Sequence, residues 1–122
     1  MARNARGVNI RRILDQYGER AARAAREALK ENAAELVNEA KERVPVMTGK
    51  LRASIHAEET RGGDRIKVTA DAKDAKGTPY AAIVEYSPAI NRPFLYPAFY
   101  ALRSEMIERV KEKLRLELRR NV

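Results

Sequence analysis

With 122 residues, the chain is long enough to form one domain with a modest core and too short to form two. It contains no cysteine, which excludes disulfides and thiolate metal sites and is compatible with an intracellular assembly environment. The net charge of +8 lies at the two ends: residues 1–30 hold eight Lys/Arg and three Asp/Glu (+5), residues 31–96 hold ten of each, and residues 97–122 hold seven and four (+3). This basic balance makes nucleic acid a partner to consider.

The N-terminal sequence MARNARGVNIRRIL is basic, but it lacks the continuous apolar segment and the small-residue cleavage pattern of a secretory signal. No apolar run approaches the roughly 20 residues that a membrane-spanning helix needs. We therefore expect a soluble protein made in the cytoplasm, with no membrane contact. Residues 1–8 are expected to form a flexible basic arm and residues 9–122 a single domain.

The segment 9–43 has apolar residues at helical spacing. The pattern predicts one long helix, in which Gly18 loosens the first turns and the apolar stripe shifts by one residue near Ala28, so that the buried face rotates or the helix bends. Pro45 is expected to end this helix, because proline has no amide proton and disfavours the helical conformation in the residue before it.

A hairpin is predicted after a corner at residues 48–49. Apolar and polar residues alternate over residues 51–56 and again over residues 65–70, where Ile66 and Val68 should face inward. The RGGD sequence between the two runs supplies the glycines of a tight turn, since glycine adopts positive φ without a steric penalty. Two antiparallel strands should result.

A short helix and a second long helix complete the predicted fold. The polar segment ADAKDAKGT should be an exposed loop, and TPYAAIVEYSP predicts a short helix with Thr78 as its cap and Pro79 at its first position. Prolines hold Phe94 and Leu95 in an extended or turn conformation, and a long amphipathic helix follows from Pro97. The fold class is therefore α+β: a long N-terminal helix, a small antiparallel sheet, a short helix, and a long C-terminal helix packed on the sheet.

The triplet Thr48, Gly49 and Lys50 raises the question of a phosphate-binding loop. Such a loop leaves a strand and enters a helix, has several glycines, and follows its lysine with Ser or Thr. Here the triplet leaves a helix, enters a predicted strand and is followed by Leu51. Nucleotide binding is therefore not supported.

The remaining polar residues form no evident catalytic or metal-binding set. His56 is the only histidine, so the chain alone cannot build a Ser/His/Asp arrangement or a His-rich metal site. Asp71 and Asp74 lack the further oxygens of a calcium loop. Glu85 lies among apolar neighbours and is better interpreted as a structural salt bridge or a cap than as a catalytic acid. No cofactor, metal or enzymatic activity is expected.

The aromatic residues do not favour a groove for single-stranded nucleic acid, because such a groove would interleave aromatic and basic side chains. Instead, four of them fall where the core needs bulk: Tyr80, Phe94, Phe99 and Tyr100.

Three motifs occur in order along the chain: RVPVMTGKLRASI, PYAAIVEYS and RPFLYPAF. Together they resemble the gp-ten-like family of head–tail joining proteins of long-tailed phages and prophages. In that family a P-V-x-T-G-x-L-R-x-S corner precedes a tyrosine-alanine segment that leads to Val-Glu and usually Gly, and a Pro-Phe-Leu-x-Pro-Ala entry opens the last helix. Ser87-Pro88 departs from the usual Gly and small polar residue. The matching positions serve as turns, core contacts or helix starts: Pro45, Thr48, Gly49, Leu51, Arg52, Tyr80, Ala81, Val84, Glu85, Pro93, Phe94, Leu95, Pro97 and Ala98.

The resemblance implies a structural virion protein, a head–tail connector or tail completion subunit in the neck or at the top of the tail. It would form a ring, with six copies expected, between the head connector or adaptor proteins and the tail terminator or tail tube proteins. The ring would enclose the channel through which DNA leaves the head, and assembly would take place in the host cytoplasm. Copy number, level in the neck and orientation to the channel stay open.

Two charged surfaces on the N-terminal helix are candidates for contacts between ring subunits, although a solvated face is the simpler interpretation. They consist of Arg20, Arg23 and Arg26 on the basic side and Glu31, Glu35 and Glu39 on the acidic side. The alternative function is a nucleic-acid-binding module acting through the arginine-rich N-terminal helix. Passive contact with DNA in the channel would use the candidate DNA-facing residues Arg3, Arg6, Arg11 and Arg12.

Overall fold

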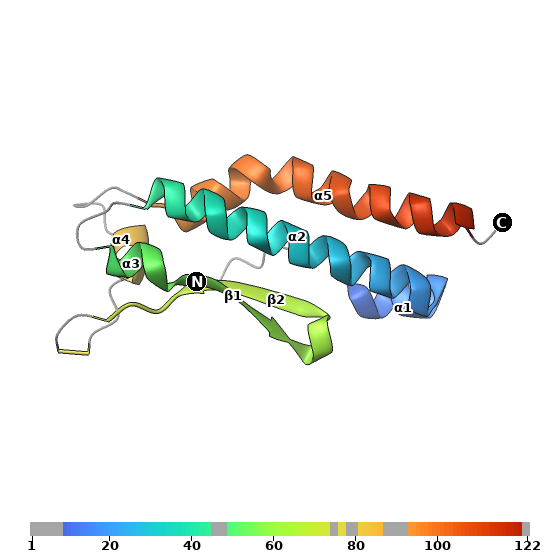
Figure 1. Ribbon diagram of the computed structural model, residues 1–122, viewed down its shortest axis with the longest axis horizontal. Helices are drawn as coiled ribbons and strands as arrows, with labels where there is room; N and C mark the ends of the chain where they lie inside the picture. Colours follow the sequence, from blue (N-terminus) through green and yellow to red (C-terminus); the bar gives the residue numbers. More distant parts are fainter. Residues whose placement is uncertain (1–8, 45–48, 74–75, 78–80, 87–92, 121–122) are drawn as a thin grey trace.

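The computed structural model describes residues 9–44, 49–73, 76–77, 81–86 and 93–120. The helices are α1 (Ile10–Tyr17), α2 (Glu19–Arg43), α3 (Lys50–Ser54), α4 (Ala81–Tyr86) and α5 (Leu95–Arg120), and the strands are β1 (Ile55–Thr60) and β2 (Arg65–Ala70) (Figure 1). The predicted α+β class and the order of its main elements are confirmed.

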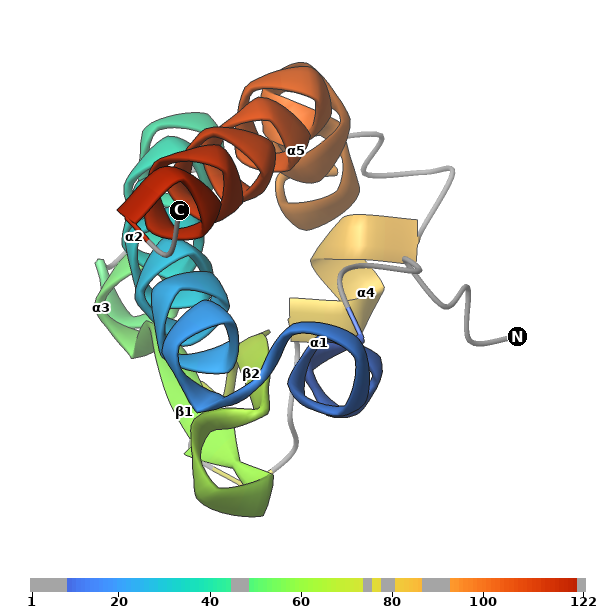
Figure 2. The ribbon, with the colours of Figure 1, turned by 90° about the vertical axis from the view of Figure 1, so that its right-hand side faces the viewer.

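The elements form three layers, with α2 in the middle. Helix α5 runs antiparallel to α2 on one side, and the β1–β2 hairpin lies on the other side of α2 (Figures 1 and 2). Helix α1 packs on the N-terminal part of α2. No helix in the described part of the chain is long and apolar enough to cross a membrane.

The predicted N-terminal helix is in fact two helices. The break is at Gly18, whose φ of 88° and ψ of −179° lie outside the helical region and suit glycine alone. Asn9 starts α1, because its side-chain oxygen accepts a hydrogen bond from the Arg12 backbone N–H at 3.1 Å. Helix α2 then continues without interruption through Ala28.

The corner after α2 differs from its prediction on one side. Helix α2 ends at Arg43 and Val44 is extended, as expected before a proline. However, residues 50–54 form the short helix α3 instead of a strand, after Gly49 in the left-handed region with φ of 79°. The alternation of apolar and polar residues over 51–56 led to a wrong prediction for residues 50–54. One helical turn also places Leu51 and Ile55 on the same side, and both are buried. Gly49 thus precedes a single helical turn that begins at Lys50, and not a strand.

The hairpin confirms the prediction of two antiparallel strands, although the first runs over Ile55–Thr60 and not over residues 51–56. In its register Ile55 lies opposite Ala70, Ala57 opposite Val68, and Glu59 opposite Ile66. Residues Arg61, Gly62 and Gly63 all have positive φ in the turn, which supports the role that the sequence assigned to the glycines. Ile66 and Val68 are half-buried on the side of α2, and Val68 packs against the main core.

Within the described residues, much of the core forms two clusters of buried side chains. The larger one joins the C-terminal part of α2 to α3, the hairpin and the start of α5, and consists of Ala40, Val44, Leu51, Ile55, Ala72, Phe94 and Ala98. The smaller one lies between α1 and α2 and consists of Ile10, Ala22 and Ala25, with Leu114 of α5 packed against it. The buried alanines of α2 explain why the neighbouring helices approach it closely.

Four details of the C-terminal half correct the predictions. Helix α5 begins at Leu95, two residues before Pro97. Its beginning, with Phe94 and Ala98, joins the core that covers the sheet, whereas most of its length lies along α2. Tyr100 was expected in the core but is 49% exposed. In the predicted loop, Ala72 is buried, whereas Thr78 and Pro79 lie outside the described residues.

Candidate assembly surface

The carboxylate of Glu85 caps the start of α5. It accepts hydrogen bonds from three consecutive backbone N–H groups, those of Phe94 (3.1 Å), Leu95 (2.5 Å) and Tyr96 (3.3 Å). The first N–H groups of a helix have no partner within the helix, and negative charge is favourable at that end. The interpretation of Glu85 as a cap is confirmed, and it joins the second sequence motif to the third.

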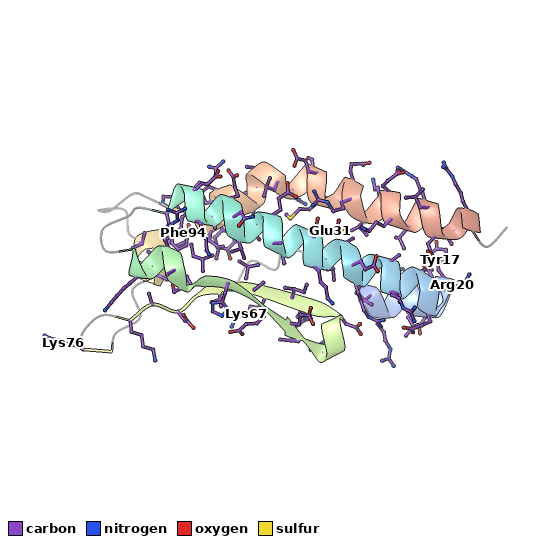
Figure 3. All side chains as sticks on the ribbon, viewed as in Figure 1. Tyr17, Arg20, Glu31, Lys67, Lys76 and Phe94 are labelled. Atoms are coloured by element: carbon purple, nitrogen blue, oxygen red, sulfur yellow. The ribbon has the colours of Figure 1, made fainter. Side chains whose placement is uncertain are left out.

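The other motif residues serve the packing of the domain. Leu51 and Phe94 are buried and Val84 packs against the same cluster, at the end of the molecule where α3, α4 and the start of α5 meet (Figure 3). Arg52 and Pro93 are exposed. Pro45, Thr48 and Tyr80 lie outside the described residues. The placed members of the three motifs therefore gather at one end of the molecule.

A polar network, which sequence reasoning missed, ties α2 to α5. Asn32 is buried, donates from Nδ2 to the carbonyl oxygen of Met106 at 3.1 Å, and accepts from Arg109 at 2.6 Å. Arg109 also lies 2.5 Å from Glu35 Oε2, as an ion pair without hydrogen-bond alignment, and 3.6 Å from Glu31. The network could have been suspected from the position of Asn32 in the alanine-rich buried row of α2, because a buried amide requires hydrogen-bond partners.

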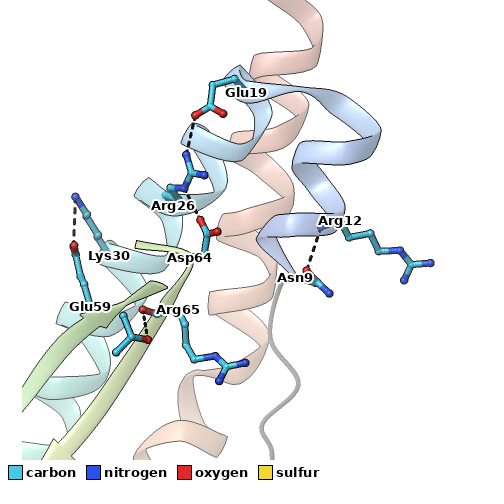
Figure 4. A network of polar contacts seen from close by, with 9 residues as sticks. Asn9, Arg12, Glu19, Arg26, Lys30, Glu59, Asp64 and Arg65 are labelled. Carbon is cyan, nitrogen blue, oxygen red and sulfur yellow. Dashed lines mark hydrogen bonds and ion pairs between the residues drawn. The ribbon is translucent and has the colours of Figure 1, made fainter. Parts of the chain in front are cut away.

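A second network fixes the tip of the hairpin to α2. Arg26 donates to Asp64 at 2.8 Å and to Glu19 at 2.9 Å, so that one guanidinium joins the hairpin to the first turn of α2 (Figure 4). Hydrogen bonds to Asp64 first and then to Glu19 raise the pKa of Arg26 above its usual value. Lys30 forms a weaker contact with Glu59 of β1 at 3.5 Å.

The structure brings most of the predicted interface charges into contacts within one chain. Arg26 is held by Glu19 and Asp64, Glu39 pairs with Arg43, and Glu31 also contacts Lys113 at 3.1 Å at the boundary of α2 and α5 (Figure 3). Arg20 and Arg23 are exposed. A role for these six residues between subunits stays a prediction.

Of the candidate DNA-facing residues, the structure describes two. Arg11 and Arg12 lie on α1 and are exposed. Arg3 and Arg6 lie outside the described residues, as does the arm that residues 1–8 were expected to form. A DNA contact of these four arginines stays a prediction.

His56 lies on the face of the sheet that points away from α2, and both its ring nitrogens contact acceptors. Its Nε2 lies 2.7 Å from Glu58, and its Nδ1 lies 2.6 Å from the carbonyl oxygen of Ser54, the last residue of α3. These contacts, that with Glu58 first, raise the pKa of His56, and the same hydrogen bond lowers the pKa of Glu58. Within the described residues no group of three or more His, Asp or Glu side chains could hold a metal ion. Asp74 lies outside them.

This arrangement defines a small α+β structural domain, in which the matched motifs provide a turn, core contacts and a capped helix start. The chain belongs to a bacteriophage tail-component family: the family model described as "Bacteriophage HK97-gp10, putative tail-component" matches residues 9–86, which is more than half of the chain. Neither a curated protein nor a solved structure gives a significant match. By its family, the protein is therefore a phage tail component.

Proposed function

We propose that the protein is a head–tail connector or tail completion subunit. Six copies form a ring in the neck or at the top of the tail, between the head connector or adaptor proteins and the tail terminator or tail tube proteins. The ring surrounds the channel through which DNA leaves the head, and it assembles in the host cytoplasm. Membership of the phage tail-component family carries this proposal.

The placement of the motif residues supports a structural role without catalysis. Gly49 supplies a left-handed turn, Leu51 and Phe94 fill the core, and Glu85 caps α5. Each of these residues therefore has a role in the fold. The layered subunit also has different surfaces on its α5 side and its hairpin side (Figure 2), and a closed ring needs two unlike faces that fit each other.

The direct test removes the protein from an assembling phage. A chain-terminating mutation in its gene should give full heads and separate tails that remain unjoined, and addition of the purified protein to that lysate should restore joined particles. Joined but shortened or misshapen tails would instead indicate a role inside the tail. Normal infectious particles without the protein would refute a structural role in the virion.

The copy number has its own measurement. Native mass spectrometry of the purified protein, alone and with the neighbouring neck and tail proteins, should give a closed oligomer of six subunits. A stable dimer, or a monomer under every one of these conditions, would contradict the ring.

The nucleic-acid-binding alternative is supported by the exposure of Arg11, Arg12 and Arg23, none of which has an ion pair among the described residues. The engagement of Arg26 with Asp64 and Glu19 works against it. A titration of the single subunit with duplex DNA at two salt concentrations distinguishes the two functions. Micromolar binding that weakens steeply with salt favours the module, because each neutralised phosphate releases counterions, and the absence of binding favours the ring component.

A further inference from the structure

Large exposed apolar side chains concentrate on α5. Of the five in the described part of the chain, four belong to this helix: Tyr100, Ile107, Leu116 and Leu118, with exposures between 39% and 49%. Helix α5 is also an outer layer of the molecule, with α2 on its inner side (Figures 1 and 2). Isolated exposed apolar residues are ordinary, but several on one helix face indicate a contact surface.

Three of the four lie in one row with cations. Tyr100, Arg103, Ile107, Lys111 and Leu118 follow one another at intervals of three, four, four and seven residues, which places them on one side of a helix. All five are exposed. No carboxylate belongs to this cationic row. Lys111 lies 3.6 Å from Glu108 of the neighbouring flank, whereas Arg103 has no ion pair among the described residues.

A second row lies on the other flank of α5 and is acidic. It consists of Ala101, Glu105, Glu108, Glu112 and Leu116, at intervals of four, three, four and four residues, and all five are exposed. Residues two apart point to nearly opposite sides of a helix, so Arg103 and Glu105 face away from each other. Between the rows, Met106 and Val110 are buried toward the interior. Cations neutralise part of this row, since Arg115 lies 3.3 Å from Glu112, Lys111 lies 3.6 Å from Glu108, and the exposed Arg119 follows on the same flank. Glu105 has no ion pair among the described residues.

We propose that the cationic row of α5 in one subunit packs against the acidic row of α5 in the next subunit of the ring. This inference rests on the proposed ring. The occupant is a second copy of this chain because the charges are complementary between the two flanks of the same helix, with apolar side chains in both rows to exclude water. A contact that brings two cationic rows together would be unfavourable, because their cations would repel. A head-to-tail contact pairs unlike rows and can close into a ring.

This contact differs from the charged surfaces on α2. Glu31 and Glu35 of α2 already pair with Arg109 and Lys113 on the inner side of α5, so their charge is largely used within the subunit. On the outer side of α5, Lys111 pairs with Glu108 and Arg115 with Glu112, but Arg103 and Glu105 have no ion pair among the described residues, so their charges are available for a neighbouring subunit. Surface charges also act mainly on partner choice and orientation, which is what a ring contact between identical chains requires.

Charge exchange provides the test. Arg103→Glu and Glu105→Arg are each expected to raise the protein concentration at which half of the subunits are in the ring by about tenfold, because each change replaces an attraction by a repulsion at every subunit contact. The double variant restores the attraction with the signs exchanged, so it should assemble close to the wild-type concentration. Sedimentation velocity of the full chain over a concentration series measures this midpoint concentration for the two single variants and the double variant.

Matched controls separate folding from assembly. Lys67→Glu on the sheet and Glu42→Arg on α2 make the same charge reversals at exposed positions outside both rows, and they should leave the midpoint concentration unchanged. Every variant must also keep the wild-type circular dichroism spectrum. Ile107→Ser tests the apolar part without changing charge and should weaken assembly as well.

Different results overturn different claims. A wild-type ring that persists unchanged in both single variants, or a double variant no better than the singles, refutes the contact between α5 rows and leaves the ring proposal intact. A wild-type chain that stays monomeric both at its highest soluble concentration and with the neck and tail proteins refutes the ring, and this contact with it.

Discussion

The cap formed by Glu85 gives the most decisive prediction about the fold. Its carboxylate satisfies three consecutive N–H groups at the start of α5, although it lies nine residues before the first of them in the sequence. Glu85→Ala removes all three bonds together with a favourable charge at the helix start. Hydrogen bonds to a charged group contribute about 1.5–3 kcal/mol, and loss of a capping side chain costs about 1 and up to 2 kcal/mol. Because water can reach part of this half-buried site, we expect a loss of about 2–3 kcal/mol in the free energy of unfolding.

Urea unfolding followed by circular dichroism measures that loss, and a thermal midpoint lower by about 10 °C should accompany it. Glu85→Gln keeps an acceptor but removes the charge, so it should lose about half as much. Glu42→Ala is the control, since Glu42 is an exposed helical glutamate for which we expect a change within about 0.5 kcal/mol. If Glu85→Ala unfolds at the same urea concentration as Glu42→Ala, the contacts to the α5 backbone do not hold this helix start in place.

The remaining predictions concern the other polar and backbone features. Asn32→Ala should cost about 2 kcal/mol, because it removes the hydrogen bonds of the buried amide to the Met106 carbonyl and to Arg109, and a double-mutant cycle with Arg109→Ala should give a coupling of about 1–2 kcal/mol; additive losses would contradict a shared network. Since the pKa of His56 is raised and that of Glu58 is lowered, their pairing contributes fully between about pH 4.5 and 6.5. The stability difference between wild type and His56→Gln should therefore shrink as the pH rises through the raised pKa of His56, or falls through the lowered pKa of Glu58, and a difference independent of pH would oppose this. Gly18→Ala should cost about 1–3 kcal/mol through its backbone conformation alone, since an added Cβ meets nothing within 4 Å; an unchanged unfolding midpoint would refute that strain.

Much of the fold could be predicted because the sequence marks its own boundaries. Proline at position 45 ends α2 at Arg43, and the glycines of RGGD produce the positive-φ turn that sets the hairpin register. These residues restrict the backbone locally, so their effect does not depend on the rest of the chain. The role of Glu85 could also be predicted from the sequence. A carboxylate among apolar neighbours is expected to need a polar partner nearby, and the backbone N–H groups at the start of the next helix provide one.

The errors occurred where two local interpretations fit the same residues. Gly18 could loosen a helix or break it, and its ψ of −179° decides for a break. The segment 50–54 alternates like a strand but forms one helical turn that still buries Leu51. In both places the choice depends on packing between distant segments, which a single sequence does not reveal.

The polar contacts between α2 and α5 were beyond sequence reasoning for a similar reason. Asn32 and Arg109 are 77 residues apart, and nothing near either one in the sequence indicates its partner. The row of glutamates on α2 therefore suggested a surface open to other subunits. The structure instead gives Glu31 and Glu35 partners on α5, so the candidate interface could be listed from the sequence but its internal contacts could not.

The position of α2 between two layers would affect the rigidity of each subunit in the proposed ring. Two of its charged side chains contact the neighbouring layers, Glu35 toward α5 and Arg26 toward the hairpin. These contacts fix α5 and the hairpin relative to each other, because both are tied to the same helix. A subunit made rigid in this way would hold its outer α5 rows in a fixed orientation. Ring closure would depend on this, because an error in the angle between neighbouring subunits is repeated at every contact. Arg109→Ala removes contacts between α2 and α5 without changing either outer row, so it should broaden the distribution of oligomer sizes. A variant that still forms rings of a single size would show that the contacts between α2 and α5 do not set the angle between subunits.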